Sequence, residues 1–146
     1  MRSSISRARC AVSLLGALAL LIGCGTRVSL DEPIEGPTWR LASVAQQPVA
    51  QAVEPQREAR LQFNGARVSG SSGCNQLSGA YQRSGSSLKI GPLAATRMAC
   101  ADPARAALES EFLAALQGTS SYSLLGSQLI LLDGAGRSLA VLEARR

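Results

Sequence analysis

The sequence predicts a mainly β domain of the α+β class, a small antiparallel sheet or barrel with one α-helix. Apolar and polar residues alternate over many short segments, residues that favour turns separate those segments, and one stretch in the body of the chain has helical periodicity. Short strands joined by tight turns pair antiparallel, and their apolar face must be covered. We therefore expect the sheet to curl around the helix or to close into a small barrel.

The first strands are expected at residues 38–43 and 60–63, where apolar residues alternate with polar ones. A period of two is typical of a strand with one buried face. Residues 46–56 contain two prolines and are expected to form a loop between these strands. Asn64-Gly65 predicts a hairpin, because both residues tolerate positive φ, and Val68 then belongs to the returning strand.

The middle of the chain predicts further short strands. Residues 70–79 are rich in Gly and Ser, and Tyr81 follows them in an expected strand. A turn at 84–86 leads to an alternating segment at 88–90, which is another expected strand. Residues 93–98 are expected to form a short strand or a bend.

One helix is expected from Pro103 to residue 116 or 117. Asp102 suits the N-cap, Pro103 suits the first helical position, and Gly118 suits a C-terminal stop. Apolar residues at helical spacing form one stripe on this helix: Leu108, Phe112, Leu113 and Leu116. Arg105 and Glu109 are four residues apart and are expected to form an exposed ion pair.

More strands are expected after the helix. Residues 122–124 lead to a turn at 126–127, and the apolar run at 129–132 forms the next expected strand. The Asp-Gly-Ala-Gly sequence at 133–136 turns the chain back into a last strand around 139–141.

The N-terminus predicts a lipoprotein signal peptide over residues 1–23. Three arginines precede an apolar run at 11–22, which is too short to form a transmembrane helix. The run closes on a Leu-Ile-Gly-Cys sequence, whose Cys24 is expected to carry the lipid and to begin the mature protein. An ordinary signal peptide with a chance cysteine is the alternative.

The segment that follows is expected to hold the domain near a membrane. Residues 24–35 are polar and predict a tether. Gly25, rather than an aspartate, follows Cys24, which favours a lipid anchor in the outer membrane of the cell envelope, facing the periplasm. The membrane, reached through the N-terminal lipid, is thus the first expected partner.

Two cysteines remain in the expected mature chain, Cys74 and Cys100. An even pair in an exported protein predicts a disulfide. A reactive thiol pair or two metal ligands are the alternatives. There is no CxxC motif and no histidine, so no metal site and no cofactor are expected.

The charge of the chain does not indicate a nucleic-acid partner. The net charge of +5 includes three arginines of the signal peptide, and the remainder carries twelve basic and ten acidic residues. A nucleic-acid-binding domain has a dense basic patch, whereas these basic residues are scattered.

Several short motifs, in this order and spacing, resemble the META domain family, which includes HslJ-like heat-shock lipoproteins. They are Gly73-Cys74-Asn75, Gly79 with Tyr81, Thr96 with Met98 and Cys100, and Glu111-Phe112. The resemblance implies a META domain at residues 36–143, with a barrel-like β fold and one helix. It also implies a role in the bacterial envelope under heat or antibiotic stress, novobiocin in particular. It implies no reaction and no ligand.

We expect the motif residues to have structural roles. Gly73 permits the turn that brings Cys74 to Cys100. Asn75 is expected to satisfy buried backbone groups or to adopt a left-handed conformation, and Met98 is expected in the core. Gly79 and Thr96 are likewise expected to serve the structure of the domain. Tyr81 and Tyr122 are expected to fill the core, or to line a cavity if the sheet closes. A ligand pocket is expected between the helix and the open end of the sheet.

The sequence does not favour an enzyme. It has no histidine, and its only lysine, Lys89, is expected on the outer side of a strand. Glu109 and Glu111 point in different directions on the helix, and Glu54 and Glu58 are placed in or near a loop. The Gly-Ser-Ser-Gly run at 70–73 lacks the ending of a phosphate-binding loop.

We therefore expect a non-catalytic binding or structural module, a monomer whose partner is an envelope protein or an apolar ligand. One alternative is a protease inhibitor that presents residues 46–56. The other is a chaperone or pilot protein for an outer-membrane client.

Overall fold

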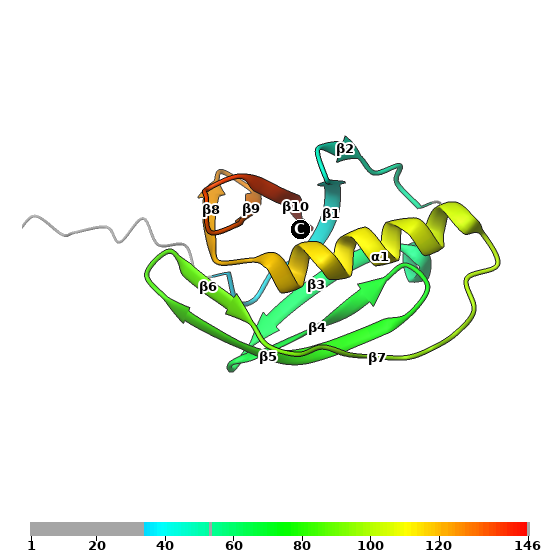
Figure 1. The fold of residues 1–146 in the computed structure, drawn as a ribbon, viewed down its shortest axis with the longest axis horizontal. Helices are drawn as coiled ribbons and strands as arrows, with labels where there is room; N and C mark the ends of the chain where they lie inside the picture. Colours follow the sequence, from blue (N-terminus) through cyan, green and yellow to red (C-terminus); the bar gives the residue numbers. More distant parts are fainter. Residues whose placement is uncertain (1–33, 53, 146) are drawn as a thin grey trace, which may run out of the picture.

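The computed structural model describes residues 34–52 and 54–145, and within them the strands form a closed antiparallel barrel with one α-helix (Figure 1). The eight strands of the barrel are β1 (Thr38–Val44), β3 (Ala59–Asn64), β4 (Arg67–Ser72), β5 (Gln76–Ser84), β6 (Ser87–Ile90), β8 (Ser121–Leu125), β9 (Gln128–Leu132) and β10 (Ser138–Arg145). The expected fold class is confirmed.

Two further strands and one helical turn lie outside this ring. β2 (Gln47–Pro48) pairs with β1, β7 (Ala94–Ala95) pairs with β5, and η1 (Pro55–Arg57) is a 3-10 turn before β3. Two parts of the predicted loop at 46–56 therefore have regular structure, Gln47–Pro48 and Pro55–Arg57. No helix in the described residues is long and apolar enough to cross a membrane.

Most neighbouring strands are joined by tight hairpins, as the turn residues predict. At the β3–β4 hairpin the prediction is wrong by one residue. Asn64 pairs with Arg67, so Gly65 and Ala66 form the turn, with φ of 54° and 64°. Two consecutive residues with positive φ match the right-handed twist of the strands that they join.

The first and last strands close the barrel. β1 pairs with β10 along its whole length, from Thr38 opposite Arg145 to Val44 opposite Ala140. On its other edge, β1 pairs with β3 only as far as Arg40, and β2 takes over that edge at Ser43 and Val44. The barrel therefore opens between the second half of β1 and the start of β3.

The helix α1 (Pro103–Gly118) lies across the barrel end where this opening occurs (Figure 1). It contacts strands on both sides of the barrel, namely β1, β4, β6, β9 and β10. The predicted N-cap is confirmed, because the Asp102 carboxylate accepts a hydrogen bond of 2.9 Å from the Ala104 amide. Gly118 does not stop the helix but belongs to it, and Thr119 is the C-cap.

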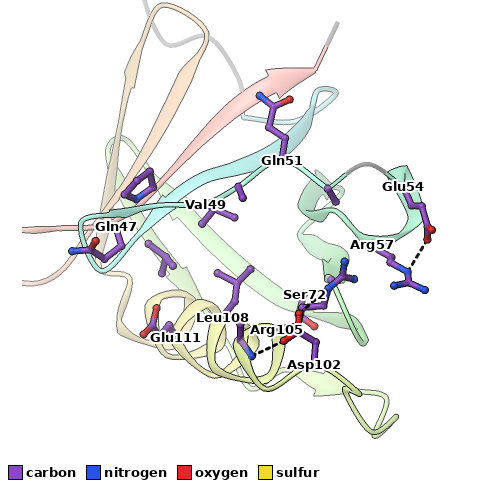
Figure 2. Close-up of a pocket in the computed structure, with 16 residues that line it drawn as sticks. Gln47, Val49, Gln51, Glu54, Arg57, Ser72, Asp102, Arg105, Leu108 and Glu111 are labelled. Carbon is purple, nitrogen blue, oxygen red and sulfur yellow. Dashed lines mark hydrogen bonds and ion pairs between the residues drawn. The ribbon is translucent and has the colours of Figure 1, made fainter.

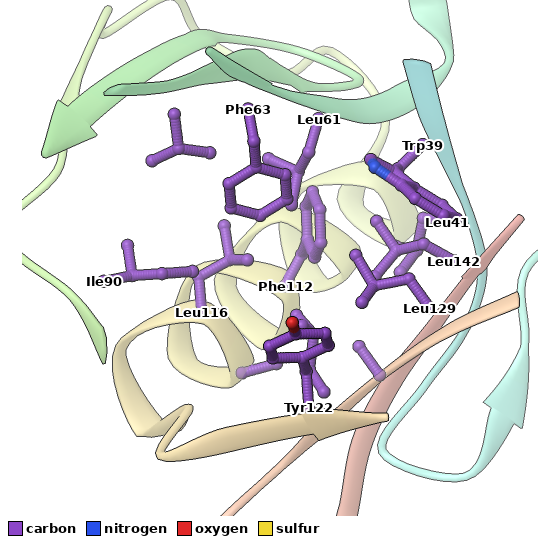
Figure 3. Packing of buried hydrophobic residues seen from close by; sticks show 14 of the residues in the cluster. Trp39, Leu41, Leu61, Phe63, Ile90, Phe112, Leu116, Tyr122, Leu129 and Leu142 are labelled. Carbon is purple, nitrogen blue, oxygen red and sulfur yellow. The ribbon is translucent and has the colours of Figure 1, made fainter. Parts of the chain in front are cut away.

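The buried face of α1 fills the core from this end (Figure 3). Phe112, Ala115 and Leu116 are buried, whereas Leu108 and Leu113 are half-buried at the edges of the predicted stripe. Phe112 and Leu116 point in among side chains from the strands, which are Trp39, Leu41, Leu61, Phe63, Ile90, Tyr122, Leu129 and Leu142.

The opposite end of the barrel is filled by Ile34, a residue of the predicted tether. Its side chain is fully buried, and its carbonyl accepts a 2.8 Å hydrogen bond from Trp39 Nε1. Glu35 forms a bridge with Phe63, near the end of β3. The last two residues of the predicted tether therefore belong to the folded domain. The predicted signal peptide, Cys24 and the rest of the tether lie outside the described residues.

Tyr81 helps to hold this end together. Its hydroxyl donates a hydrogen bond to the Glu35 carboxylate, and its ring packs edge-on against Phe63 at 5.0 Å. Burial, together with the hydrogen bond and the negative charge of Glu35, raises the pKa of Tyr81 to about 12. Tyr81 and Tyr122 are both buried in the core, which is the first of the two roles predicted for them.

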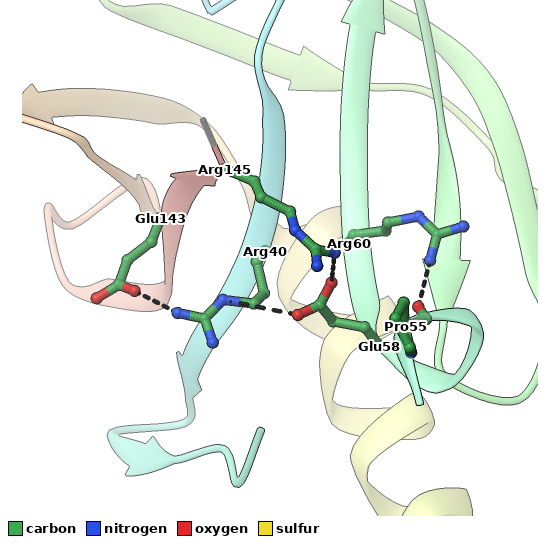
Figure 4. A network of polar contacts seen from close by, with 6 residues as sticks. All are labelled: Arg40, Pro55, Glu58, Arg60, Glu143 and Arg145. Carbon is green, nitrogen blue, oxygen red and sulfur yellow. Dashed lines mark hydrogen bonds and ion pairs between the residues drawn. The ribbon is translucent and has the colours of Figure 1, made fainter. Parts of the chain in front are cut away.

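An ionic network crosses the outside of the barrel where β1 and β3 separate (Figure 4). The Glu58 carboxylate lies 2.8 Å from Arg145 and 3.8 Å from Arg40, and Arg40 lies 2.6 Å from Glu143. Glu58 is 9% exposed, and a carboxylate this buried requires such partners. The network links the start of β3 to β1 and β10.

Replacing Ile34 tests whether this residue is part of the folded domain. We expect Ile34→Ala to lower the free energy of unfolding by about 2–5 kcal/mol, because a fully buried side chain is truncated. Urea denaturation followed by circular dichroism measures the change. Leu125→Ala is the control, because Leu125 is 67% exposed. Equal stabilities of the two variants would show that Ile34 does not contribute to the core.

Candidate functional site

A pocket of about 520 Å³ lies where β1 has left β3, and we call it the seam pocket (Figure 2). Its three walls are the segment at 44–52, the first half of α1, and η1 together with Ser72 and Gly73. The sequence prediction placed a cavity between the helix and the open end of the sheet, and the seam pocket lies there.

The seam pocket has both apolar and charged walls. The half-buried side chains of Val49 and Leu108 face each other across it, and the ion pair between Glu54 and Arg57, 2.7 Å apart, lies at its edge (Figure 2). β2 ends the order of paired strands, so one of its edges has no partner strand in the described part of the chain. Such walls suit a ligand with an apolar part and a polar backbone or head group.

Arg105 also lines the pocket, but its partner differs from the predicted one. The sequence predicted an exposed pair between Arg105 and Glu109. Instead Arg105 lies 3.8 Å from the Asp102 carboxylate, and the Glu109 side chain points to the other side of the pocket wall, toward Ser72 and Asn75.

The predicted disulfide joins Cys74 and Cys100 directly behind this wall. The two Cα atoms are 5.7 Å apart, a normal separation for a disulfide. Gly73 has a φ of 99°, a conformation that favours glycine, and its amide donates to Ser71 Oγ at 3.1 Å. The glycine therefore permits the turn that brings Cys74 to its partner, as predicted.

Asn75 holds the two disulfide-bearing segments together. Its Oδ1 accepts hydrogen bonds from the Met98 amide at 2.7 Å and from Thr96 Oγ1 at 2.9 Å. Its Nδ2 donates to the Met98 carbonyl at 3.2 Å and to Glu109 Oε1 at 2.9 Å. The prediction that Asn75 satisfies backbone groups is confirmed. The left-handed alternative is wrong, because Asn75 is not among the residues with positive φ.

Glu109 completes this cluster, and sequence reasoning missed its role. Its carboxylate accepts hydrogen bonds from Ser72 Oγ at 2.8 Å and from Asn75, and its Oε2 lies 3.7 Å from Cys100 Sγ. A signal was present in the sequence. Glu109 precedes Phe112 by three residues and Leu116 by seven, so it lies on the inner face of the helix.

The structure brings some of the motif residues together and separates others. Gly73, Asn75 and Thr96 share the cluster beside the disulfide, whereas Tyr81 lies at the Ile34 end of the barrel. Gly79 allows a close approach, because a Cβ there would lie 2.8 Å from Leu93 Cδ2.

Met98 contributes its backbone to this cluster. Its side chain is 68% exposed, so the prediction of a core role is wrong. The Asn75 side chain bonds both the amide and the carbonyl of Met98 and so fixes this residue at the surface.

Comparison with protein families decides the relationship that these motifs indicate. The model of the META domain matches residues 32–146. The chain belongs to the META domain family. The match begins two residues before Ile34, in agreement with the burial of that residue.

Solved structures share the fold of this META domain. One NMR structure has 26% sequence identity and a TM-score of 0.60, and the match covers 75% of this chain and 90% of the other. An NMR structure of a protein from Burkholderia xenovorans has 25% identity and a TM-score of 0.57, with coverage of 77% and 83%.

A third match agrees in fold alone. It is the crystal structure of a DUF4847 family protein from Bacteroides vulgatus, with 16% identity, a TM-score of 0.55, and coverage of 77% and 95%. A comparison with curated proteins finds no match.

Replacing Asn75 tests how much the cluster contributes to stability. We expect Asn75→Ala to lower the free energy of unfolding by roughly 2–4 kcal/mol, because several hydrogen bonds of about 0.5–1.5 kcal/mol each are lost around a buried residue. Thermal and urea unfolding with the disulfide intact measure the effect. Gln82→Ala, at an exposed position of β5, is the matched control. A loss no larger than that of the control would contradict the assigned role.

Proposed function

We propose that this META domain protein is a lipid-anchored, non-catalytic binding module of the cell envelope and that its partner binds in the seam pocket. Three findings support this: the family, which is not a known enzyme family, the N-terminal sequence pattern, and the opening in the barrel wall. The proposal depends mainly on the opening. It gives a partner access to the end of the barrel where α1 otherwise covers the core.

The chemistry of the pocket favours an extended segment of an envelope protein as the ligand. Val49 and Leu108 offer apolar contact in the pocket. The edge of β2 has only two residues, and because Pro48 has no N–H it can offer a carbonyl acceptor there but no donor. An extended segment presents both apolar side chains and backbone N–H groups, so it matches apolar walls beside a carbonyl acceptor. This occupant agrees with a chaperone or pilot role for an outer-membrane client.

The position of Ile34 supports an orientation in which the pocket faces away from the membrane. Ten residue steps separate Cys24 from Ile34, so the tether would span at most about 35 Å. Ile34 lies near the end of β3, whereas Ser72, in the pocket wall, pairs with Ala59 at its start. A lipid on Cys24 would thus hold the barrel by the end opposite to the seam pocket.

A protease inhibitor is less well supported. The segment at 46–56 was the candidate inhibitory loop, but β2 and the hydrogen bond from the Val49 amide to the Ala42 carbonyl, 2.8 Å long, attach it to β1. The same segment lines the pocket rather than standing clear of the domain.

The anchor is tested by replacing the cysteine that would carry the lipid. We expect Cys24→Ala to move the protein from the membrane fraction to the soluble periplasmic fraction, or to leave it as an uncleaved precursor, because no acyl chains can be attached. Fractionation and mass spectrometry of the N-terminus measure the outcome. Cys10→Ala, within the predicted signal peptide, should remain lipidated. Normal lipid attachment in Cys24→Ala would disprove the anchor.

The pocket is tested by filling it. Ala104 lines the seam pocket, whereas Ala107 is exposed on α1 outside it. We expect Ala104→Trp to abolish crosslinking of an envelope protein to a photoreactive residue at position 51, because the larger side chain fills the pocket, and to lower survival under heat or novobiocin. Ala107→Trp should behave as the unmodified protein. If Ala104→Trp keeps both properties, the partner does not bind in the pocket.

A further inference from the structure

The disulfide and Glu109 place three metal-ligand atoms in one small volume. Cys74 Sγ, Cys100 Sγ and a carboxylate oxygen of Glu109 all lie within 4.8 Å of one another, and all three residues are half-buried. Two sulfur atoms and one oxygen are a ligand set that zinc accepts when the sulfurs are thiolates. In the oxidised protein the sulfurs are bonded to each other and do not bind a metal ion.

The two cysteines would remain neighbours after the disulfide is reduced. The Asn75 side chain bonds Met98 and Thr96, and the Thr96 amide donates to the Gln76 carbonyl at 3.0 Å. Gln76 N also donates to Thr96 Oγ1 at 3.0 Å. These bonds join the segments of the two cysteines without using either sulfur.

Glu109 is likewise held in place without the disulfide. Ser72 Oγ and Asn75 Nδ2 both donate to its carboxylate, at 2.8 Å and 2.9 Å. A carboxylate has about four lone-pair positions, so these bonds leave room for a metal ion. Hydrogen bonds to a ligating carboxylate orient it and commonly accompany metal sites.

We propose that reduction of the disulfide converts this cluster into a binding site for a thiophilic divalent cation such as Zn²⁺. A dithiol reductant supplies two electrons and two protons to the Cys74–Cys100 bond and itself becomes a disulfide. The cation then displaces the two thiol protons, forms two metal–sulfur bonds and one bond to Glu109, and keeps a water molecule as fourth ligand. The disulfide and the metal ion are therefore alternative states of one site.

Cobalt(II) is the probe for the first test, because cobalt–thiolate bonds absorb in the near ultraviolet. The full chain carries Cys10→Ala and Cys24→Ala, so that the remaining thiols are those of Cys74 and Cys100. After anaerobic reduction we expect one Co²⁺ per chain with a sulfur-to-cobalt charge-transfer band. The same protein left oxidised should give no band. No band after reduction would overturn the proposal.

Glu109→Gln tests the third ligand, because it keeps the shape of the side chain and removes the charge. We expect cobalt affinity to fall by about tenfold or more, as loss of a ligand should cost at least as much as loss of an outer-shell partner. Glu111→Gln, on the exposed face of α1, should bind as the parent chain does. Equal affinities of Glu109→Gln and the parent would remove Glu109 from the site.

The unsubstituted ligand set is tested by X-ray absorption of the zinc-loaded, reduced chain. We expect two sulfur atoms at about 2.3 Å and oxygen at about 2.0–2.2 Å. Zn²⁺ should also raise the melting temperature of the reduced chain and leave that of the oxidised chain unchanged. A zinc site with only one sulfur ligand would overturn the proposal, and so would equal shifts of the melting temperature in the two redox states. Neither measurement requires the Glu109→Gln variant to fold.

Discussion

The pairing of β1 with β10 is the constraint on which the rest of this structure depends. A strand has two edges, and β10 occupies one edge of β1 from Thr38 to Val44. The other edge pairs with β3 only to Arg40 and then with β2. Closure is thus complete around the core but leaves an opening at one end, and this opening decides where α1 and the seam pocket lie.

Polar side chains stabilise the places where regular pairing ends. Glu58, on the outside of the opening, joins the start of β3 to Arg40 and Arg145. Beside α1, where β4 ends and β5 begins, Asn75 bonds Glu109 of the helix and the Met98 backbone and so joins these segments. Buried polar groups are costly unless they are bonded, and every described buried side-chain nitrogen or oxygen has a partner. The opening is therefore a stable part of the fold.

Local patterns predicted the elements of the fold well but its tertiary contacts poorly. The alternation of apolar and polar residues predicted most of the barrel strands, and Asp102 with Pro103 predicted the start of α1. These signals depend only on residues that are neighbours in the sequence. Glu109 was missed because its partners are Ser72 and Asn75, more than thirty positions away. Ile34 was assigned to a tether because one isolated apolar residue has no periodicity, and the seam pocket joins segments that no motif links.

The packing of Ile34 has a mechanical consequence. Tension on the chain ahead of Ile34 would first act on the buried Ile34 side chain and on the hydrogen bond from Trp39 to the Ile34 carbonyl. It would then pull β1 along its own axis. The hydrogen bonds of β1 to β10 and β3 lie across that direction, because both pairings are antiparallel. They would share the load in shear instead of breaking one after another, so the barrel is built to resist force applied from its N-terminal end.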